Sequence, residues 1–533
     1  MAGAFLDVAE SGTTKKSDNG IGLYNDMLAI FLQVASPFTN YQKAFDELEA
    51  KHLEVATHLV SKDMQETAGS VSSTAGFEEL QDATERLKDL APFIFPMTEG
   101  SLDRFELLNG GYQVGPALSA VDKILTQHVG ELVIAIRTLS AAMIADVEKV
   151  ADMFDEQYVM CAMEVLKLAG NLSRDLRGFE MKTRERLFVM SERMIAHLKH
   201  EMEIQKAASN KLSKAGSFSL PDAISIVEID SVLTKVFCGE DEANDEGTST
   251  SLLVLQRLSG TPDVGPPMEL FPEAEGAIKR LVNSCHTFVF DVCSSVPRKH
   301  LGGILEMTAW KEKPTDDAFD SYGTLPQQYI TQVGEHMLAL VQAFEPFAAD
   351  PETLSLANEV MDGVRNVALQ PWGEFVASAG IIDFESIVGT LMDGREITEL
   401  VLNNAALTEE DAELEEGISD DERASAAFCN AWLDVVGLAV TGRLLERVMR
   451  IPQLTHKGCE HLSADLNYLV NVFSALGVAG HPHPLITHLA EVANLSDNDL
   501  LAHISTRDPD NAIEAALRAI EVRVALLRGV SVS

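Results

Sequence analysis

The sequence predicts an all-α protein made of successive antiparallel helical bundles. Over most of the 533 residues, apolar side chains recur at spacings of three and four, which is the period of an amphipathic helix. No convincing series of alternating apolar and polar runs is joined by Asn-Gly or Asp-Gly turns, so strands are not expected. At about 150 residues per domain, the length corresponds to about three packed units or one elongated body.

Helices are expected first over residues 21–238, after a polar leader at residues 1–20 that we expect to be mobile. In the clearest segment, residues 124–147, the apolar side chains share one side of a helix and Asp122 lies outside that side. This pattern is typical of a helix that packs in a bundle. Residues 157–207 continue the spacing with charges between the apolar positions, and they predict a second long helical hairpin.

A linker is expected at residues 239–268, where Gly, Pro, Ser, Thr and acidic residues gather and cannot sustain a buried core. Helical spacing then resumes and predicts a middle helical bundle over residues 269–408. Residues 409–422 hold nine acidic side chains in fourteen positions, so mutual repulsion favours a solvated loop. A C-terminal helical bundle is expected over residues 423–533.

The chain is strongly acidic, with 82 Asp and Glu residues against 41 Lys and Arg residues, and its formal net charge is −41. This charge opposes binding to nucleic-acid phosphates and to bare anionic membranes, so neither is expected as a direct partner. Six cysteines without short regular spacing are too few for a disulfide framework and indicate a reducing compartment.

The sequence predicts neither secretion nor a membrane span. The N-terminal residues lack the basic and apolar regions of a secretory signal peptide. The most apolar long stretch, residues 132–147, is interrupted by Arg137 and Asp146, so any membrane contact is expected to be peripheral.

Familiar catalytic motifs are missing from the sequence. A phosphate-binding loop needs Gly-x-x-x-x-Gly-Lys-Ser/Thr after a strand, and Gly110, Gly111 and Gly115 lack both the lysine and the strand. We interpret these glycines as a turn between helices, with Pro116 opening the next helix. The Gly-x-Ser-x-Gly and His-Glu-x-x-His patterns are also absent, which removes the simplest support for a serine hydrolase or a zinc protease.

Two groups of side chains resemble metal ligands only weakly. His481, His483 and His488 lie in and after a proline-containing loop that leads into an amphipathic helix, where exposed histidines are common without a ligand. The second group lies in an apolar helix, where buried cysteines act as small hydrophobic residues. It consists of Cys285, His286 and Cys293. We therefore predict no catalytic, cofactor-binding or metal-binding residue, and the alternative of a metal-dependent helical enzyme that uses His481, His483 and a carboxylate stays open.

Residues 325–347, LPQQYITQVGEHMLALVQAFEPF, resemble a segment of the conserved oligomeric Golgi complex subunit seven family. In this stretch the apolar side chains fall within one arc of a helical wheel, and Pro346 is expected to end the helix at Glu345. The residues that carry the similarity are Pro326, Tyr329, Ile330, Gly334, Leu340, Glu345, Pro346 and Phe347.

Residues 451–477, IPQLTHKGCEHLSADLNYLVNVFSALG, resemble a second segment of the same family. The apolar positions predict a core stripe, and Gly477 is placed to cap the helix. Asp465, Tyr468 and Asn471 project from another side, which either packs within its own bundle, meets solvent or binds a partner. The matching residues are Ile451, Pro452, Leu454, Leu462, Asp465, Tyr468, Leu469, Asn471, Val472, Leu476 and Gly477.

Fainter similarity keeps the same order along most of the chain. The family carries a further N-terminal helical region, and we interpret this chain as an incomplete subunit or a divergent gene product without it. The resemblance implies that the bundles stack into an elongated rod, as in the helical-rod tethering complexes. It also implies a non-enzymatic subunit of that complex, without a cofactor, peripheral on the cytosolic face of Golgi membranes.

In the family, the implied role is the capture of retrograde intra-Golgi vesicles, which supports the recycling of glycosylation enzymes. The implied partners are the other subunits of the complex, fusion proteins of the SNARE type and small GTPases, with only indirect membrane contact and no nucleic acid. A helical-rod subunit of another vesicle-tethering complex, such as an exocyst-like one, stays open as an alternative.

Overall fold

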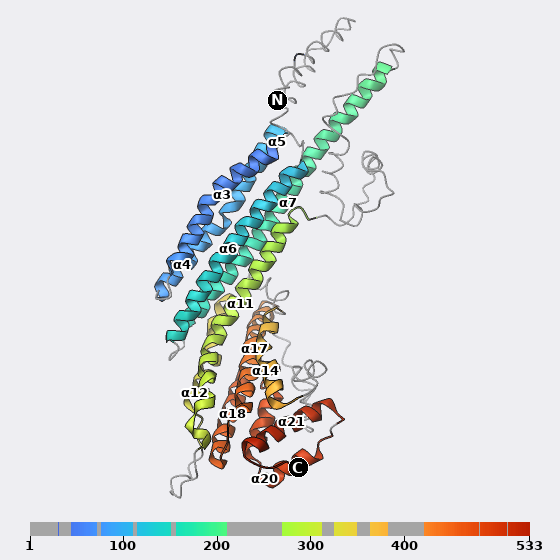
Figure 1. The fold of residues 1–533 in the computed structure, drawn as a ribbon. Helices are drawn as coiled ribbons and strands as arrows, with labels where there is room; N and C mark the ends of the chain where they lie inside the picture. Colours follow the sequence, from blue (N-terminus) through green and yellow to red (C-terminus); the bar gives the residue numbers. More distant parts are fainter. Residues whose placement is uncertain are drawn as a thin grey trace. The chain divides into compact units, whose positions relative to one another are not determined.

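The structure, a computed structural model, is helical wherever it describes regular secondary structure (Figure 1). No strand occurs in these described ranges, so the predicted all-α class is confirmed. The described residues are 30, 44–71, 76–109, 114–150, 156–209, 269–311, 324–348, 363–381, 420–478, 480–508 and 510–532.

The helices are labelled in chain order. Those of the first half are α3 (Phe45–Ser70), α4 (Phe77–Leu90), α5 (Ile94–Asn109), α6 (Val114–Val150) and α7 (Glu156–Ser209). Those of the second half are α11 (Pro272–Gly302), α12 (Gln328–Ala348), α14 (Gln370–Ala379), α17 (Asp420–Met449), α18 (His456–Leu476), α19 (Pro484–Asn494), α20 (Asp497–Thr506) and α21 (Ala512–Leu527). The short 3-10 segments are η1 (Ala91–Phe93), η2 (Gly303–Glu306) and η3 (Thr308–Lys311).

The chain divides into two compact units, each formed by several stretches of sequence. The first unit consists of Met1–Leu59, Ile94–Thr126 and Arg177–Ala274. The second unit consists of Val60–Phe93, Gln127–Leu176 and Glu275–Ser533. The domain boundaries and the rod expected from the sequence stay predictions.

In the first unit, aromatic side chains join α5 to its neighbours. The ring centroids of Phe45 in α3 and Phe105 in α5 lie 5.8 Å apart, and those of Phe95 in α5 and Phe179 in α7 lie 5.9 Å apart. All four side chains are buried. Each buried aromatic side chain removes a large apolar area from water, so these contacts help to hold α5 against α3 and α7.

Asp122 is buried and caps the start of α11, whereas the sequence placed it outside the apolar side of its helix. One carboxylate oxygen accepts the backbone N–H of Ala274 at 2.8 Å, and the other accepts that of Glu273 at 3.2 Å. The first N–H groups of a helix lack partners within the helix, and the helix dipole favours a negative charge there. The helical pattern does not reveal this role because the capped helix lies far away in the sequence.

The core of the second unit contains all three tryptophans of the chain, Trp310, Trp372 and Trp432, each at most 1% exposed. The Trp372 indole N–H donates to the carbonyl of Leu438 at 2.9 Å and so joins α14 to α17. A Cβ atom at Gly442 would lie 2.5 Å from the Trp372 ring, so only glycine allows this approach of the two helices. Tryptophan fluorescence therefore reports on the second unit alone.

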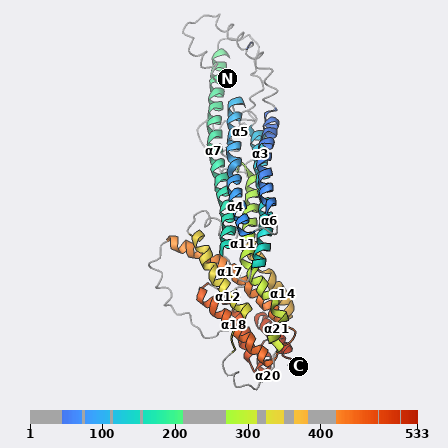
Figure 2. The ribbon, with the colours of Figure 1, turned by 90° about the vertical axis from the view of Figure 1, so that its left-hand side faces the viewer.

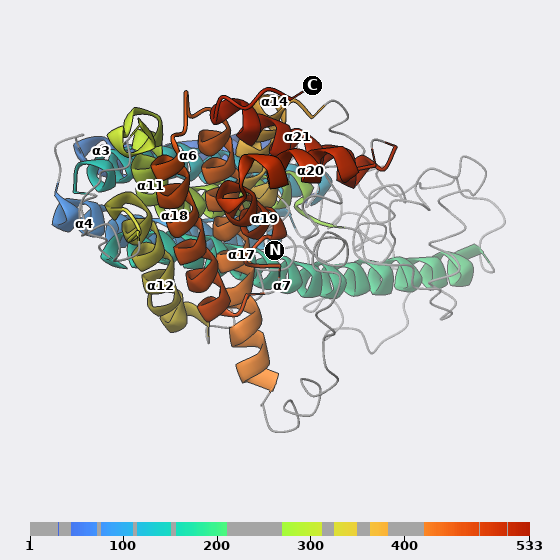
Figure 3. The ribbon, with the colours of Figure 1, turned by 90° about the horizontal axis from the view of Figure 1, so that it is seen from below.

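Helix α12 packs against α17 and against α18 (Figure 2), and α18 also packs against α19. Helices α20 and α21 pack together near the C-terminus (Figure 2). Seen from below, α12 and α18 run side by side (Figure 3). The second unit thus brings together helices that lie more than a hundred residues apart in the sequence.

Two helix boundaries predicted from the sequence are wrong. Instead of a hairpin over residues 157–207, the structure has the single 54-residue helix α7, because the segment contains no proline and its glycines are isolated. Helix α12 continues past Glu345 to Ala348, with Pro346 inside it. Phe347 is 5% exposed and Ala348 is fully buried, so their burial outweighs the backbone hydrogen bond that Pro346 cannot make.

The predicted acidic loop also ends earlier than expected, because α17 begins at Asp420 and includes residues 420–422. Residues 409–419, the leader at residues 1–20 and the linker at residues 239–268 lie outside the described residues.

Two helices of the described part are long and apolar enough to cross a bilayer, judged by length and composition alone. The first is Gly115–Lys149, and 39% of its most apolar 18-residue window is buried. The second is Ala426–Met449, and 72% of the corresponding window is buried. Core helices that pack inside a protein meet the same criteria. The packing of α17 against α12 and α14 identifies the second of them as a core helix.

Candidate functional site

The two segments that resemble the family, residues 325–347 and 451–477, meet where α12 packs against α18 (Figure 3). Their contact centres on Asp465, which is fully buried. One carboxylate oxygen accepts the backbone N–H of Gln327 at 2.7 Å, and the other accepts the hydroxyl of Tyr329 at 2.8 Å. Asp465 therefore ties the start of α12 to the middle of α18.

A close approach of the two helices follows one turn further along α12. A Cβ atom at Gly334 would lie 2.6 Å from Cε1 of Tyr468, 2.9 Å from its hydroxyl oxygen and 3.0 Å from Val472. The glycine therefore leaves the space that the tyrosine ring occupies. We call the contacting residues the α12–α18 junction. It consists of Gln327, Tyr329, Gly334, Asp465, Tyr468 and Val472.

Replacing Gly334 by alanine is expected to lower the free energy of unfolding by about 1 to 3 kcal/mol, since the added methyl group overpacks the junction. Combining it with Tyr468→Ala removes the obstacle, so the double variant should lose less than the sum of the two single losses. Urea unfolding followed by tryptophan fluorescence measures each value.

The matched control is Gly373→Ala in α14, where nothing lies within 4 Å of the added Cβ atom. Because alanine favours a helix over glycine, this variant should gain up to about 1 kcal/mol. Additive losses for Gly334→Ala and Tyr468→Ala would show that the two positions do not touch.

The junction buries a carboxyl group whose ionisation is disfavoured. Burial raises the pKa of Asp465 to about 6, although the hydrogen bonds from Gln327 and Tyr329 and the nearby His461 act in the opposite direction. Burial and the adjacent Asp465 charge raise the pKa of the Tyr329 hydroxyl well above its usual range. The tyrosine therefore stays a hydrogen-bond donor at neutral pH.

A pH-dependent stability term is expected from Asp465. Its pKa in the folded chain lies above its value in the unfolded chain, which is near 4. At pH values between these two pKa values, the folded chain therefore binds more protons than the unfolded chain. The stability it contributes is full below the unfolded pKa and is lost as pH rises through about 6. Between about pH 4.5 and 7.5, wild type should therefore lose about 2 kcal/mol relative to Asp465→Asn, which does not titrate. Urea titrations of both proteins at several pH values measure this difference, and a constant difference would contradict it.

The other family-like residues divide into a buried and an exposed set. Beyond the junction, those in the core are at most 5% exposed; they are Ile330, Leu340, Phe347, Ile451, Leu454, Leu462 and Leu469. Those at the surface or half-buried are Pro326, Glu345, Pro346, Pro452, Asn471, Leu476 and Gly477. Gly477 caps α18 with a φ of 65°, and this left-handed backbone conformation favours glycine. Of the three polar residues expected on one side of α18, the structure buries Asp465, half-buries Tyr468 and exposes Asn471.

The three histidines near the C-terminus are held separately, and they are not exposed as the sequence suggested. His481 Nε2 lies 3.1 Å from a carboxylate oxygen of Asp434. The ring of His483 accepts the backbone N–H of Leu485 at 3.2 Å and caps α19. His488 is paired with a different carboxylate. Within the described ranges, no group of three or more His, Cys, Asp or Glu side chains is arranged to hold a metal ion.

Cys285, His286 and Cys293 lie in α11 as buried side chains, as the sequence analysis interpreted them. Burial raises the pKa of both thiols well above the usual value, so neither is a thiolate at neutral pH. Burial also lowers the pKa of His286 to about 4. His286 is therefore neutral at physiological pH, and its Nδ1 lies 2.8 Å from the carbonyl of Val282.

Sequence reasoning also missed two carboxylates of the second unit that are fully buried. Glu446 is fully buried in α17, where Arg443, Arg447 and Arg450 approach it at 3.3, 3.3 and 2.7 Å. The spacing of these four residues along one helix is the signal that could have revealed the cluster.

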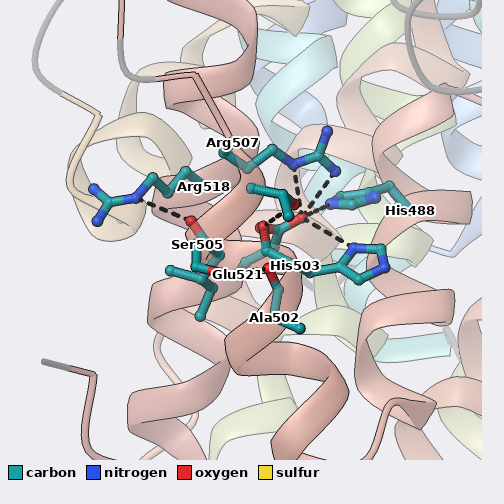
Figure 4. Close-up of polar contacts among 9 residues, drawn as sticks. His488, Ala502, His503, Ser505, Arg507, Arg518 and Glu521 are labelled. Carbon is teal, nitrogen blue, oxygen red and sulfur yellow. Dashed lines mark hydrogen bonds and ion pairs between the residues drawn. The ribbon is translucent and has the colours of Figure 1, made fainter.

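The second missed carboxylate is Glu521, which is fully buried in α21 (Figure 4). Its Oε1 lies 2.9 Å from Arg507 and 3.2 Å from His488, and His503 lies 4.0 Å away. Burial alone would raise its pKa, but the contacts with His488 and Arg507 outweigh burial and lower it. No local motif marks this cluster, because its members come from α19, α20, α21 and the turn after α20.

The chemistry of these groups is structural. In the junction, the carboxylate of Asp465 accepts hydrogen bonds from a backbone amide and a tyrosine, and no base contacts a nucleophile among those residues. The two buried glutamates neutralise arginine side chains that join α17 and α21 to their surroundings. These arrangements hold helices together.

The sequence model of the family described as Golgi complex component 7 matches residues 25–366. Curated relatives named conserved oligomeric Golgi complex subunit 7 match over most of the chain. The protein from Arabidopsis thaliana is 20% identical over 483 residues, which cover 84% of this chain and 47% of that protein. The proteins from Bos taurus and Homo sapiens are 20% and 19% identical and are covered to 49% and 51% of their length. The chain thus spans about half the length of these relatives, and no solved structure matches it significantly.

Proposed function

Because the chain belongs to the Golgi complex component 7 family, we propose that it is a non-enzymatic subunit of the conserved oligomeric Golgi complex. The observation that carries this proposal is the family match over residues 25–366. It is supported by relatives that share one name and match 84% to 87% of this chain. The α12–α18 junction adds to it, because residues of both family-like segments meet there.

In this role the protein acts as a scaffold. Each helix buries one side within its own unit and presents another side to neighbouring chains, so affinity comes from helix-to-helix surfaces and requires no nucleophile. The complex would capture retrograde intra-Golgi vesicles and so support the recycling of glycosylation enzymes. Its other subunits are the proposed direct partners, and SNARE proteins and small GTPases are further partners.

Recruitment to the cytosolic face of Golgi membranes is proposed to depend on protein partners. A net charge of −41 is repelled by the anionic lipids of a cytosolic leaflet. The purified chain alone should therefore remain unbound when floated with vesicles of phosphatidylcholine and phosphatidylserine. Binding that persists without partner proteins would contradict this mode of recruitment.

Affinity purification of the tagged chain from Golgi extract, at moderate salt and with mass spectrometry of the companions, tests the proposal. Recovery of the other subunits of the oligomeric Golgi complex in near-equal amounts is the expected result. Recovery of subunits of a different tethering complex, or of no companion, would refute it. A preparation whose second unit is unfolded is recognised by its exposed tryptophans, because all three are buried in that unit when it is folded.

A further inference from the structure

Three arginines of α17 gather on one side of that helix, in a chain whose 82 acidic residues outnumber its 41 Lys and Arg residues. Arg443, Arg447 and Arg450 follow spacings of four and three residues, so they lie within about 60° of one another around the helix. Their side chains are 24%, 19% and 45% exposed, so solvent reaches each of them. We call these three residues the arginine group of α17.

Two carboxylates offset only part of this positive charge. Glu446 has no exposed surface and lies 2.7 to 3.3 Å from the three arginines. Glu374 of α14 lies 3.6 Å from Arg443 and from Arg450, and its side chain is 53% exposed. Water and salt weaken such an exposed pair. Three positive charges therefore meet two negative charges, and one of the two carboxylates is at the surface.

The pKa of Arg443 reflects the same imbalance. Burial lowers this pKa, and the charges of Arg447 and Arg298 act in the same direction. The charges of Glu446 and Glu374 raise the pKa, but they do not offset the other effects. A further anion beside the arginine group would therefore be favoured.

Hydrogen bonds to Glu446 do not fix the orientation of the arginine group. Among the described residues, Nε of Arg443, Nε of Arg447 and both carboxylate oxygens of Glu446 are buried without a hydrogen-bond partner. Nε of Arg450 donates to the hydroxyl oxygen of Ser378 at 3.1 Å, which places a hydroxyl beside the guanidinium groups. Guanidinium groups bind oxyanions through two or more parallel hydrogen bonds, and several of them suit the three oxygens of a phosphate group.

We propose that the arginine group of α17, together with Ser378, binds the phosphate group of a phosphorylated side chain on a partner chain. Phosphorylated lipid headgroups offer the same chemistry, but an anionic membrane repels a chain with a net charge of −41. A phosphorylated protein is therefore the favoured source of the phosphate. This inference goes beyond the proposed function and does not depend on it.

Calorimetric titration of the full chain with two peptides of one neutral sequence, carrying either phosphoserine or serine, tests the proposal. At about pH 7.5 the phosphate group is mostly dianionic. Wild type should bind the phosphoserine peptide in preference to the serine peptide, and inorganic phosphate should compete with it. A peptide with aspartate in place of phosphoserine should bind about tenfold more weakly, since a carboxylate has one charge and two oxygens.

Two variants of the site should change phosphoserine binding in opposite directions. Glu374→Gln should tighten it about threefold or more, because this variant removes a carboxylate that competes for Arg443 and Arg450. Arg447→Gln should weaken it about tenfold. Circular dichroism and tryptophan fluorescence check that Arg447→Gln folds. Glu374→Gln changes an exposed side chain, so it keeps the test decisive if Arg447→Gln unfolds.

The matched control is Arg280→Gln, which removes an exposed arginine of α11 outside the arginine group and should bind like wild type. Equal binding of the phosphoserine and serine peptides would overturn the proposal. Weaker or unchanged binding by Glu374→Gln would also overturn it, since the phosphate would then not compete with this carboxylate. Binding to vesicles with phosphorylated headgroups but to neither peptide would refute a protein as the source of the phosphate.

Discussion

Replacing Glu446 by glutamine is expected to lower the free energy of unfolding of the second unit by about 3 to 5 kcal/mol. The carboxylate is fully buried and faces three arginines, of which Arg450 is the nearest at 2.7 Å. Glutamine has nearly the same shape but carries no charge, so the three arginines lose the negative charge that they share at a fully buried position. Burial and the neighbouring Arg447 lower the pKa of Arg443, so the cluster depends on the negative charge of Glu446.

Glu374→Gln is the matched control for Glu446→Gln. Glu374 lies 3.6 Å from both Arg443 and Arg450, but its side chain is 53% exposed. Water and salt screen such a pair, so its loss should cost at most about 1 kcal/mol. Urea unfolding followed by tryptophan fluorescence measures both variants. Equal losses would mean that burial of Glu446 does not set the strength of the cluster.

Salt offers a second test of the same cluster. In the Glu446→Gln variant the remaining arginines repel one another, and added salt screens this repulsion where solvent reaches it. The stability gap between wild type and the variant should therefore narrow as salt is raised. A gap that stays constant would assign the loss to packing instead of charge.

The fold class could be predicted from the sequence because apolar spacing is a local property. Residues 124–147 show their buried side directly, and the structure forms α6 there. Helix ends were harder to predict, since tertiary burial can override a local signal. Pro346 normally disfavours a continuing helix, yet the buried Phe347 and Ala348 keep α12 helical to its end.

The residues of the candidate site could be predicted from the sequence, but the contacts between them could not. Tyr329, Gly334 and Asp465 stand out in the sequence because they resemble a family pattern, but nothing local shows that they meet across more than 130 residues. From the sequence, the side of the helix that carries Asp465 could pack within its own bundle, meet solvent or bind a partner. A polar residue on a helix is compatible with all three environments. Only the partner helix, which supplies Tyr329 and the Gln327 amide, decides that it is buried.

Buried charges such as Glu521 could not have been found from spacing. The residues that neutralise it lie on α19, α20 and the turn before α21, so its environment exists only after these elements have packed (Figure 4). An isolated glutamate in an amphipathic helix is normally solvated, and this makes exposure the reasonable expectation.

Truncating Trp432 to alanine is expected to cost about 3 to 5 kcal/mol, because it leaves a large cavity in the second unit. The fully buried indole stacks on His286 of α11, with ring centroids 5.7 Å apart, and packs against Phe344 of α12 at 5.9 Å. One side chain of α17 therefore joins three helices. Trp432→Phe keeps an aromatic ring in the site and should cost less, and Trp310 and Trp372 remain as fluorescent probes in both variants.

The same substitution should also change the response to pH. In wild type, burial holds the pKa of His286 near 4, below the unfolded value of about 6.5, so the stability it contributes is lost as pH falls through that range. A cavity beside the ring admits water and brings its pKa back toward 6.5, so the variant loses less stability on acidification. The destabilisation by Trp432→Ala should therefore be smaller at about pH 5 than at about pH 7. Equal destabilisation at both pH values would mean that the indole does not keep water from His286, and that the stacked pair contributes packing alone.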